Sequence, residues 1–359
     1  MSNIRLEIVH DFTAFMRLRN EWNSALEKSG LNNPFLRHEW LSSWWKEYGR
    51  DKELHVVCFK KGEQVIGFIP LMKYRTKLTG LGVKAIGFIS SHWTRMDFII
   101  SEDRADCINQ LIDLWKQSGY VVILAQMPQD SENFICLKKG LENKKIRLED
   151  IPKPNAYMSL EGTWEDYLKG RSQKFRYELR RDRRHLEQRG TVQFARTQCL
   201  SADTLGQLKT IAGNSWQSKA GVSIMAAEEG RQFYKGISAE WPDGMLDFAI
   251  LKLEHKPISF QVGVISQGCY FAFEIAYDQQ YHNDSPGFIL YNFLLESLFK
   301  SGLKRCDEGY LADYKKRRSN DIMAVSDLTL FPNNLLGFIL YLANRAKGWL
   351  KSKSPSPRP

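Results

Sequence analysis

Residues 269–287 read Cys-Tyr-Phe-Ala-Phe-Glu-Ile-Ala-Tyr-Asp-Gln-Gln-Tyr-His-Asn-Asp-Ser-Pro-Gly and join an apolar strand to an apolar helix predicted over 286–300. Pro286 suits the first helical turn because its missing N–H would be unpaired there, and Asp284 or Ser285 can cap the helix. Gly287 leaves the backbone open to close approach. The free N–H groups of such a helix start favour an anion. A phosphate site and a simply well-capped helix both fit this pattern.

Similar elements recur in the two halves of the 359-residue chain. Each half shows a strand, two helices, a meander of strands, and then a helix followed by a strand. This order disfavours a doubly wound sheet and predicts an α/β fold of the α+β type, with mixed, mostly antiparallel sheets and flanking helices. The recurrence predicts tandem domains over 1–160 and 191–332, the second ending in a strand near 324–331. A basic linker helix would occupy 161–190, and 333–359 would form a basic helix with a disordered tail.

The net charge of +10 comes from two short segments. Residues 171–190 contain eight basic and three acidic side chains, and residues 333–359 contain five basic and no acidic ones. The rest of the chain is neutral overall, so local anion sites are expected and a general nucleic-acid surface is not. The six cysteines form no Cys-x-x-Cys pair and the seven histidines lack metal-ligand spacing. We therefore expect reduced thiols, a cytoplasmic protein and no metal.

Glu274 is the first candidate for acid–base chemistry, because it lies inside an apolar strand. Strand alternation places it on the face of Ala272 and Ala276, opposite Phe273 and Ile275. A carboxylate in such a strand should be paired, solvated through a cleft, or raised in pKa. A structural pairing and a catalytic role are equally compatible with this position.

The segment 304–318 combines the acidic pair Asp307-Glu308 with a basic run that includes Lys315. An acidic pair at the end of a strand is well placed for proton transfer at a pocket, and the basic run can hold phosphate. A solvated surface loop is the simpler alternative.

A helix predicted over 172–189 contains most of the arginines of the first basic segment. Arg176 and Arg180 share one flank of this helix. Arginine favours bidentate contacts to phosphate or carboxylate, so an anionic ligand and a solvated linker helix are both open.

The first half contributes Trp44, His92 and Asp97 as candidate ligand contacts. Aromatic stretches of this kind are more often core than ligand site, but polar Asp97 and His92 can face a pocket between the domains.

The stretch 335–350 is apolar at first and basic later. Its longest apolar run, 335–343, has about nine residues, far fewer than the about 20 that cross a membrane. It can dock on the second domain as core, or lie on an anionic membrane surface.

The sequence Arg-Ser-Gln-Lys-Phe-Arg-Tyr-Glu-Leu-Arg-Arg at 171–181 resembles the basic-helix signature of CelD/BcsL-type acyltransferases. These enzymes belong to the GNAT superfamily and are akin to the FemAB group. The other matching segments follow in the expected order: 35–45, Asp97-Phe98, Tyr277-Asp278, Ser285-Pro286-Gly287, Asp307, Gly309 and Tyr314-Lys315. The chain lacks the usual glycine-rich phosphate loop, since Gln261-Val262-Gly263-Val264 is followed by no Gly-x-Gly, and the helix start at 285–287 is the expected substitute.

The resemblance implies two tandem GNAT-like domains, an acetyl-CoA or other acyl-CoA donor, and a link to cellulose or other exopolysaccharide biosynthesis. The expected bases are Glu274 and Asp307. The residues expected to bind the donor are Ser285, Pro286, Gly287, Lys315, Arg176 and Arg180. Those expected to bind a sugar or amino-sugar acceptor are Trp44, His92, Asp97, Tyr277 and Asp278.

Three functions fit the sequence. The first is an acyl-CoA-dependent N- or O-acyltransferase that transfers the acyl group directly, in the cytoplasm or at the inner face of a membrane. The second is a FemAB-like transferase that uses aminoacyl-tRNA, the one nucleic acid expected as a partner. The third is a non-catalytic accessory module of polysaccharide synthesis.

Overall fold

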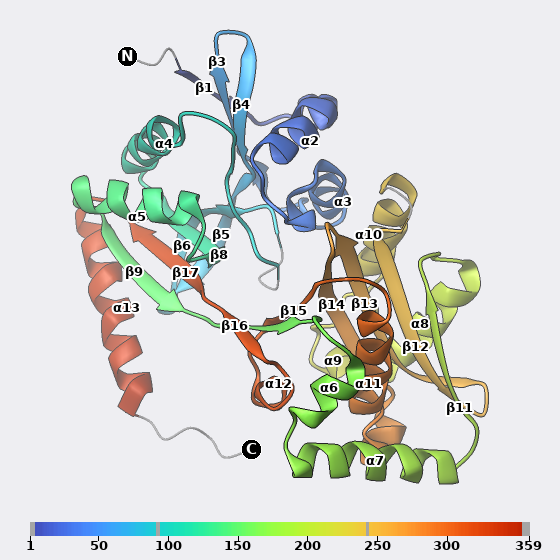
Figure 1. The fold of residues 1–359 in the computed structure, drawn as a ribbon. Coiled ribbons are helices and arrows are strands. Elements are labelled where there is room, and N and C mark those ends of the chain that lie inside the picture. The colour runs from blue at the N-terminus through green and yellow to red at the C-terminus, as the bar shows by residue number, and fades with distance from the viewer. Residues whose placement is uncertain (1–3, 91–93, 242–243, 354–359) are drawn as a thin grey trace. The chain divides into compact units, whose positions relative to one another are not determined.

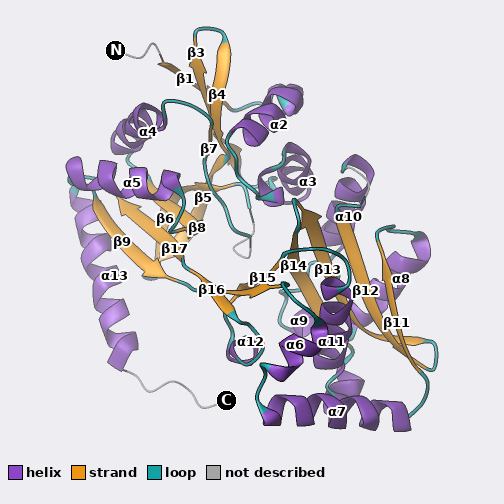
Figure 2. Cartoon of the chain, viewed as in Figure 1, coloured by secondary structure: helices purple, strands orange, loops and turns teal. Residues whose placement is uncertain are grey.

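The computed structural model describes residues 4–90, 94–241 and 244–353, and its backbone separates into two compact units (Figure 1). Unit 1 contains 1–153 and 324–359, and unit 2 contains 154–323. Both units are mixed α/β structures, in which runs of helices and runs of strands follow one another along the chain (Figure 2).

Unit 2 is built on a seven-stranded sheet with the order β11-β12-β13-β14-β15-β10-β16. Its strands are β10 (Asn155–Ser159), β11 (Val192–Thr197), β12 (Leu246–Leu253), β13 (Lys256–Ser266), β14 (Cys269–Tyr277), β15 (Arg305–Tyr310) and β16 (Asp321–Met323). The β14–β15 pair is parallel, and the other pairs of this sheet are antiparallel. The parallel pair requires a crossover connection, which a helix supplies.

The helices of unit 2 cover both faces of this sheet. They are α6 (Trp164–Lys169), α7 (Gln173–Gln188), α8 (Ala202–Gly213), α9 (Trp216–Lys219), α10 (Glu228–Glu240), η2 (Gln279–Asp284), α11 (Pro286–Phe299) and α12 (Asp313–Lys316). The crossover helix α11 packs on β12, β13 and β14, and α8 packs on β13 and β14. The α11 face forms a core that includes Tyr270, Leu294 and Cys306. The predicted helices over 172–189 and 286–300 are thus confirmed as α7 and α11.

Unit 1 contains two sheets. The four-stranded sheet has the order β1-β3-β4-β7, and the six-stranded sheet has the order β2-β5-β6-β8-β17-β9. The strands are β1 (Ile4–Val9), β2 (Glu53–Leu54), β3 (Val56–Lys61), β4 (Gln64–Ile69), β5 (Leu71–Leu78), β6 (Leu81–Phe88), β7 (Ile99–Ile100), β8 (Val121–Pro128), β9 (Arg147–Pro152) and β17 (Val325–Phe331). The β6–β8 pair is parallel, and α4 (Arg104–Ser118) lies between its strands in the sequence.

The remaining helices of unit 1 are α1 (Phe12–Arg17), α2 (Arg19–Lys28), η1 (Pro34–Leu36), α3 (His38–Tyr48), α5 (Glu132–Asn143) and α13 (Leu335–Lys353). Both units therefore contain an antiparallel meander, a crossover helix and a parallel strand, which is the recurrence expected from the sequence. The predicted α/β fold class with mixed, mostly antiparallel sheets is confirmed.

One strand of unit 1, β17, is separated from the rest of that unit in the sequence by the whole of unit 2. Strand β10, just after the first long segment of unit 1, lies between β15 and β16, whereas β17 lies between β8 and β9. The prediction that 324–331 ends the second domain is therefore wrong, because these residues pair within the sheet of unit 1. The expected boundaries at 160, 190 and 332 move to 153 and 323, and the expected linker helix lies inside unit 2.

Candidate functional site

Strands β14 and β15 pair over only three residues each. Cys269–Phe271 pair with Arg305–Asp307, and the ladder ends there, although β14 continues to Tyr277. The β14–β15 ladder therefore does not extend along the second half of β14. We call this opening the fork; its apex is the Phe271–Asp307 pair. A sheet that opens in this way exposes backbone groups in its interior.

The open edge of β14 presents backbone polar groups to the fork. Asp278 donates its backbone N–H to the Ile258 carbonyl at 2.9 Å. Because antiparallel residues alternate between facing the partner and facing away, Ile275 and Tyr277 direct their N–H and C=O groups away from β13. Gln217 donates its side-chain amide to the Ile275 carbonyl at 3.0 Å, which agrees with this orientation.

A pocket of about 500 Å³ lies at the open end of the fork, entirely within unit 2. We call it the fork pocket. Its walls are Ile275 and Tyr277 of β14, the α11 start at 285–288, one flank of α7, the aromatic Trp216, and the α12 region. The volume is in the usual range for sites that bind small molecules.

Hydrogen bonds and an ion pair hold the segment that precedes α11. Asp278 caps η2 by accepting the Gln280 N–H at 2.9 Å, and it also accepts the Asn214 amide at 2.9 Å. Arg189 of the α7 end pairs with the buried Asp284. Ser285 precedes Pro286 with φ 52° and makes no side-chain cap bond to the helix. The first turn of α11 therefore lines the pocket without the side-chain cap predicted from the sequence.

Three arginines line the fork pocket against two carboxylates. Arg317 pairs with Glu178 at 2.9 Å, and Arg181 pairs with its neighbour Asp182 at 2.6 Å. Arg318 is buried; its side chain contacts Glu308 at 2.5 Å rather than a carboxylate of the pocket. A polyanionic ligand can compete for Arg181 and Arg317, because both side chains are more than half exposed.

Sequence reasoning missed these arginines. It selected Arg176 and Arg180, but Arg176 donates to the carbonyls of 168, 169 and 171, and Arg180 is exposed away from the pocket lining. The available signal was the i, i+3, i+4 spacing of Glu178, Arg181 and Asp182, which puts them on one helix flank.

Lys315 lies beside the pocket rather than in its lining. Its ammonium donates to the Glu308 carbonyl, and burial lowers its pKa to about 8. This contact ties the short helix α12 to β15.

Glu274 is held by three donors on the α10 side of the sheet. It accepts the Ser223 hydroxyl at 2.9 Å, the Met225 N–H at 3.2 Å and the Tyr234 hydroxyl at 2.7 Å. Burial raises the pKa of its carboxyl, which is one of the three alternatives that the sequence left open for this position. The prediction that Phe273 lies on the opposite face of the strand from Glu274 is wrong, since both side chains contact Tyr234. The reason is a bulge at this point of the β13–β14 ladder, which breaks the alternation of side chains.

Asp307 occupies the apex of the fork and is 4% exposed. It accepts the Gly309 N–H at 2.8 Å. Its neighbour Cys306 belongs to the α11 core, so alternation turns Asp307 to the opposite face, which is the face of Glu274. The structure therefore brings both predicted bases to one face of the sheet, while the fork pocket adjoins the other.

The candidates of the first half lie in unit 1. Asp97 is buried; it accepts the Ser131 hydroxyl at 2.6 Å and the Asn133 amide at 2.9 Å, and burial raises its pKa to about 6. Trp44 is 8% exposed within α3. His92 lies outside the described residues. Of the residues assigned to the acceptor, Tyr277 lines the fork pocket and the buried Asp278 caps η2.

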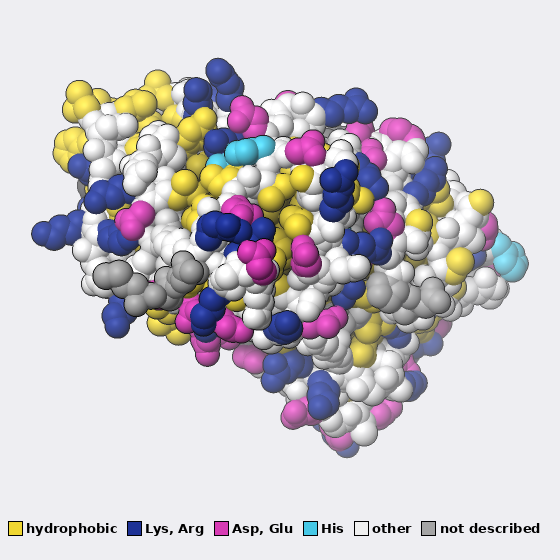
Figure 3. All heavy atoms as spheres, turned by 90° about the horizontal axis from the view of Figure 1, so that it is seen from above, with side chains coloured by type: hydrophobic (Ala, Val, Ile, Leu, Met, Phe, Trp, Pro, Cys, Tyr) yellow, Lys and Arg dark blue, Asp and Glu magenta, His cyan; other side chains and the backbone are white. Residues whose placement is uncertain are grey.

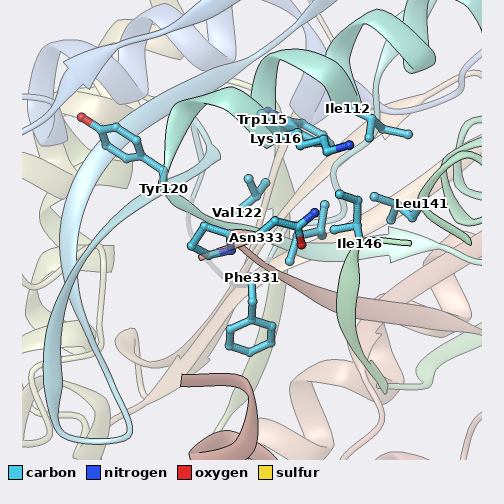
Figure 4. A pocket seen from close by; sticks show the side chains of 11 residues that line it. Ile112, Trp115, Lys116, Tyr120, Val122, Leu141, Ile146, Phe331 and Asn333 are labelled. Carbon is cyan, nitrogen blue, oxygen red and sulfur yellow. The ribbon is translucent and has the colours of Figure 1, made fainter. Parts of the chain in front are cut away.

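Unit 1 also has a small apolar pocket between α4, α5 and β17 (Figure 4). Ile112, Trp115 and Leu141 point into it, and its volume of about 10 Å³ has room for one water molecule. It is too small for an acyl donor. No cluster of three or more metal-ligating side chains occurs among the described residues.

Residues 173–316 match the family model of the acetyltransferase (GNAT) domain. Over most of its length, unit 2 is similar to a GNAT acetyltransferase domain. The protein is therefore an acyltransferase, and its fold consists of two GNAT-like units in tandem. The match spans β14, the α11 start and β15, which are the elements that form the fork.

Solved structures share this fold at low sequence identity. FemX has a TM-score of 0.58 and 10% identity, with 96% of this chain and 99% of that chain covered. L-PGS from Bacillus licheniformis has a TM-score of 0.53 and 17% identity, with 92% and 96% covered. A tandem GNAT protein from the clavulanic acid biosynthesis pathway has a TM-score of 0.50 and 8% identity, with 91% and 98% covered. No curated protein matches the sequence.

Proposed function

We propose that unit 2 binds an acyl-CoA in the fork pocket and transfers its acyl group directly to an amine or hydroxyl. The observation that carries this proposal is the fork itself, where the short β14–β15 ladder opens between an arginine-lined pocket and the carboxylates of Glu274 and Asp307. The proposed donor is acetyl-CoA or another short acyl-CoA.

The chemistry of CoA matches the pocket in two ways. Its phosphates would lie at the first turn of α11, near Ser285, Pro286 and Gly287, where helix N–H groups favour negative charge. Arg181 and Arg317 would add charge-assisted hydrogen bonds. Its pantetheine arm carries amide groups that can pair with the open edge of β14 at Ile275 and Tyr277, as an added strand would.

The reaction would take place at the fork apex. The acceptor nitrogen or oxygen attacks the thioester carbonyl carbon, a C–N or C–O bond forms, and the C–S bond breaks. The acceptor proton passes to a base, and the departing thiolate ends as the CoA thiol. Positioning of the two reactants can supply about 7–11 kcal/mol of the barrier. Backbone N–H groups that point into the fork would stabilise the oxyanion.

Glu274 and Asp307 remain the proposed bases, on the face of the sheet opposite the donor pocket. Asp307 is placed at the apex. Because Asp307 lies at the apex, we favour it as the base, and we assign Glu274 as a positioning residue that accepts hydrogen bonds from Ser223 and Met225 of the 223–225 segment and from Tyr234.

The acceptor proposed from the family resemblance is a sugar or amino-sugar precursor of an exopolysaccharide such as cellulose. This assignment rests on the CelD/BcsL-like motifs of the sequence, with Trp44, His92, Asp97, Tyr277 and Asp278 as its proposed contacts. Of these, Tyr277 is supported by its place in the fork pocket.

A FemAB-like transferase that uses aminoacyl-tRNA is the second candidate. The feature that favours it is the row of exposed arginines on α7, including Arg180, Arg183 and Arg184, next to the pocket. Such a row can follow a phosphate backbone beyond the pocket, and binding would then fall steeply with salt. The third hypothesis, a non-catalytic module, has no support in a chain that carries an acyltransferase domain.

Titration calorimetry of the full chain with acetyl-CoA tests the donor. Arg317→Ala should weaken binding about tenfold, because it removes a charge-assisted contact to phosphate. Arg180→Ala is the matched control, since Arg180 lies on α7 outside the pocket lining. Absence of binding to any CoA thioester, or equal effects of the two variants, would contradict the proposal. Binding of a stable aminoacyl-tRNA analogue instead would favour the second candidate.

A further inference from the structure

The helix α13 uses one side to dock on unit 1. Leu340 is buried in a cluster with Val83, Val121 and Phe331, and Tyr341 packs against this cluster. A Cβ atom at Gly337 would lie 2.0 Å from the Pro332 carbonyl oxygen, so the backbone of α13 approaches the chain closely there. The prediction that this segment docks on the folded chain is therefore confirmed. The predicted docking partner is wrong, because the helix packs on β9 and β17 of unit 1 rather than on the second domain.

The opposite side of α13 is apolar and exposed. Leu335 is 75% exposed, Ile339 48% and Leu342 49%. At 3.6 residues per turn these three side chains fall within about 60° of one another, on the side opposite Leu340 and Asn344. Leu336 and Phe338, which are 56% and 43% exposed, widen the strip. We call these five residues the outer strip.

The outer strip is unusual for a protein surface. Large apolar side chains that are exposed singly are normal, but five within eight consecutive residues form a contiguous patch, which marks an interaction surface. Across the face drawn in Figure 3, basic and acidic side chains are interspersed, as expected for a body that is neutral outside its two basic segments. The α13 segment differs because its charges have a single sign.

The charge of this segment indicates what kind of partner covers the outer strip. After Asp327 the sequence contains no acidic residue, and its basic residues all follow the outer strip: Arg345, Lys347, Lys351, Lys353 and Arg358. A second copy of the chain would bring like charges together. An anionic phospholipid surface instead offers an apolar interior to the strip and negative headgroups to the basic residues.

We propose that α13 is a membrane-surface anchor, which inserts its outer strip into one leaflet of an anionic bilayer while its inner side stays packed on unit 1. Among the described residues, no helix is both long and apolar enough to cross a membrane. The anchor therefore lies in the plane of the interface, as helices with one apolar side and a basic partner segment do. This goes beyond the acyl transfer proposed for unit 2, because it concerns where the chain works.

Vesicle co-sedimentation of the full chain tests the anchor. Vesicles of phosphatidylcholine alone are compared with vesicles of equal parts phosphatidylcholine and phosphatidylglycerol, at low and high salt. We expect at least about tenfold tighter binding to the anionic vesicles, and weaker binding as salt rises. The variant Leu335→Asn/Ile339→Asn/Leu342→Asn should lose about tenfold or more of the affinity for anionic vesicles.

Leu81→Asn is the matched control, since Leu81 is 51% exposed on unit 1 but far from α13 in the sequence. Thermal unfolding and acetyl-CoA binding of the triple variant should equal those of the parent, because its changes are on the surface and outside unit 2. Equal binding to both vesicle types, absence of vesicle binding, or equal effects of the triple variant and Leu81→Asn would overturn the proposal. So would a concentration-dependent dimer of the parent that the triple variant abolishes, since the strip would then join two copies.

Discussion

Replacing Glu308 with glutamine tests whether a buried ion pair holds Arg318 in the wall of the fork pocket. The Glu308 side chain is completely buried and that of Arg318 is 7% exposed. Two nitrogen–oxygen contacts of 2.7 and 2.5 Å join them. Glutamine keeps the shape of the side chain but removes its charge, so the guanidinium of Arg318 would remain buried without a counter-charge.

The loss of stability in Glu308→Gln can be estimated from the contacts of Arg318. Removal of one partner of a buried ion pair costs about 3–5 kcal/mol, because the remaining charge is left uncompensated. The Arg318 guanidinium lies 3.4 Å from the centre of the Tyr291 ring, and this cation–π contact survives the substitution and can retain about 2 kcal/mol. We therefore expect a loss near the lower limit, about 3 kcal/mol in the free energy of unfolding of unit 2.

Urea unfolding measures this loss, and hydrogen exchange of the β15 amides assigns it to unit 2. The double variant Glu308→Gln/Arg318→Met should be more stable than Glu308→Gln alone, because no buried charge is left unpaired. Glu178→Gln is the control, since its partner Arg317 is more than half exposed and such pairs contribute less than about 1 kcal/mol. The reasoning is refuted if Glu308→Gln costs no more than this control, or if the double variant is the less stable one.

Three further predictions follow from other parts of the molecule. Glu178→Gln should tighten acetyl-CoA binding about two- to fivefold by calorimetry, because Arg317 is released from a competing carboxylate; weaker binding would contradict this. Asp97, with a pKa raised from 3.8 to about 6, holds a proton that the unfolded chain has lost, so its contribution to stability is complete below about pH 4 and disappears as the pH rises through 6. The stability difference between the parent and Asp97→Asn should therefore fall by about 3 kcal/mol between pH 4 and 7 in urea unfolding, and a constant difference would show that Asp97 ionises normally. Residues 154–323 expressed alone should unfold cooperatively in a calorimeter, whereas 191–332 should not, because it lacks β10; cooperative unfolding of both fragments would show that β10 is dispensable.

Local patterns predicted the elements of unit 2 well. The strand, capped loop and helix over 269–300 follow from residue types that act within a few positions of one another, and β14, η2 and α11 occupy that stretch. The burial of the Glu274 carboxyl could be predicted from the sequence as well, because its strand is apolar. The side of the sheet on which Phe273 lies could not be predicted, because a bulge depends on the register with β13 and leaves no local signal.

Long-range pairing explains the other differences. The alternation of 325–331 identifies a strand but says nothing about which sheet it enters, and its partners β8 and β9 lie about 200 residues earlier in the sequence. Likewise, the choice of Arg181 and Arg317 over Arg176 and Arg180 depends on the phase of α7 against the fork, and on a contact between Glu178 and Arg317 that joins distant segments.

The place of β17, which joins the sheet of unit 1 but follows all of unit 2 in the sequence, has a consequence for synthesis on the ribosome. A chain that emerges from its N-terminus usually completes its N-terminal domain first. Here β8 and β9 must wait for β17, which is translated after every residue of unit 2. Unit 2 can therefore finish folding while the sheet of unit 1 still lacks its strand β17. Until residue 331 has left the ribosome, that gap exposes two strand edges, which makes unit 1 the part of the nascent protein that most needs protection from aggregation.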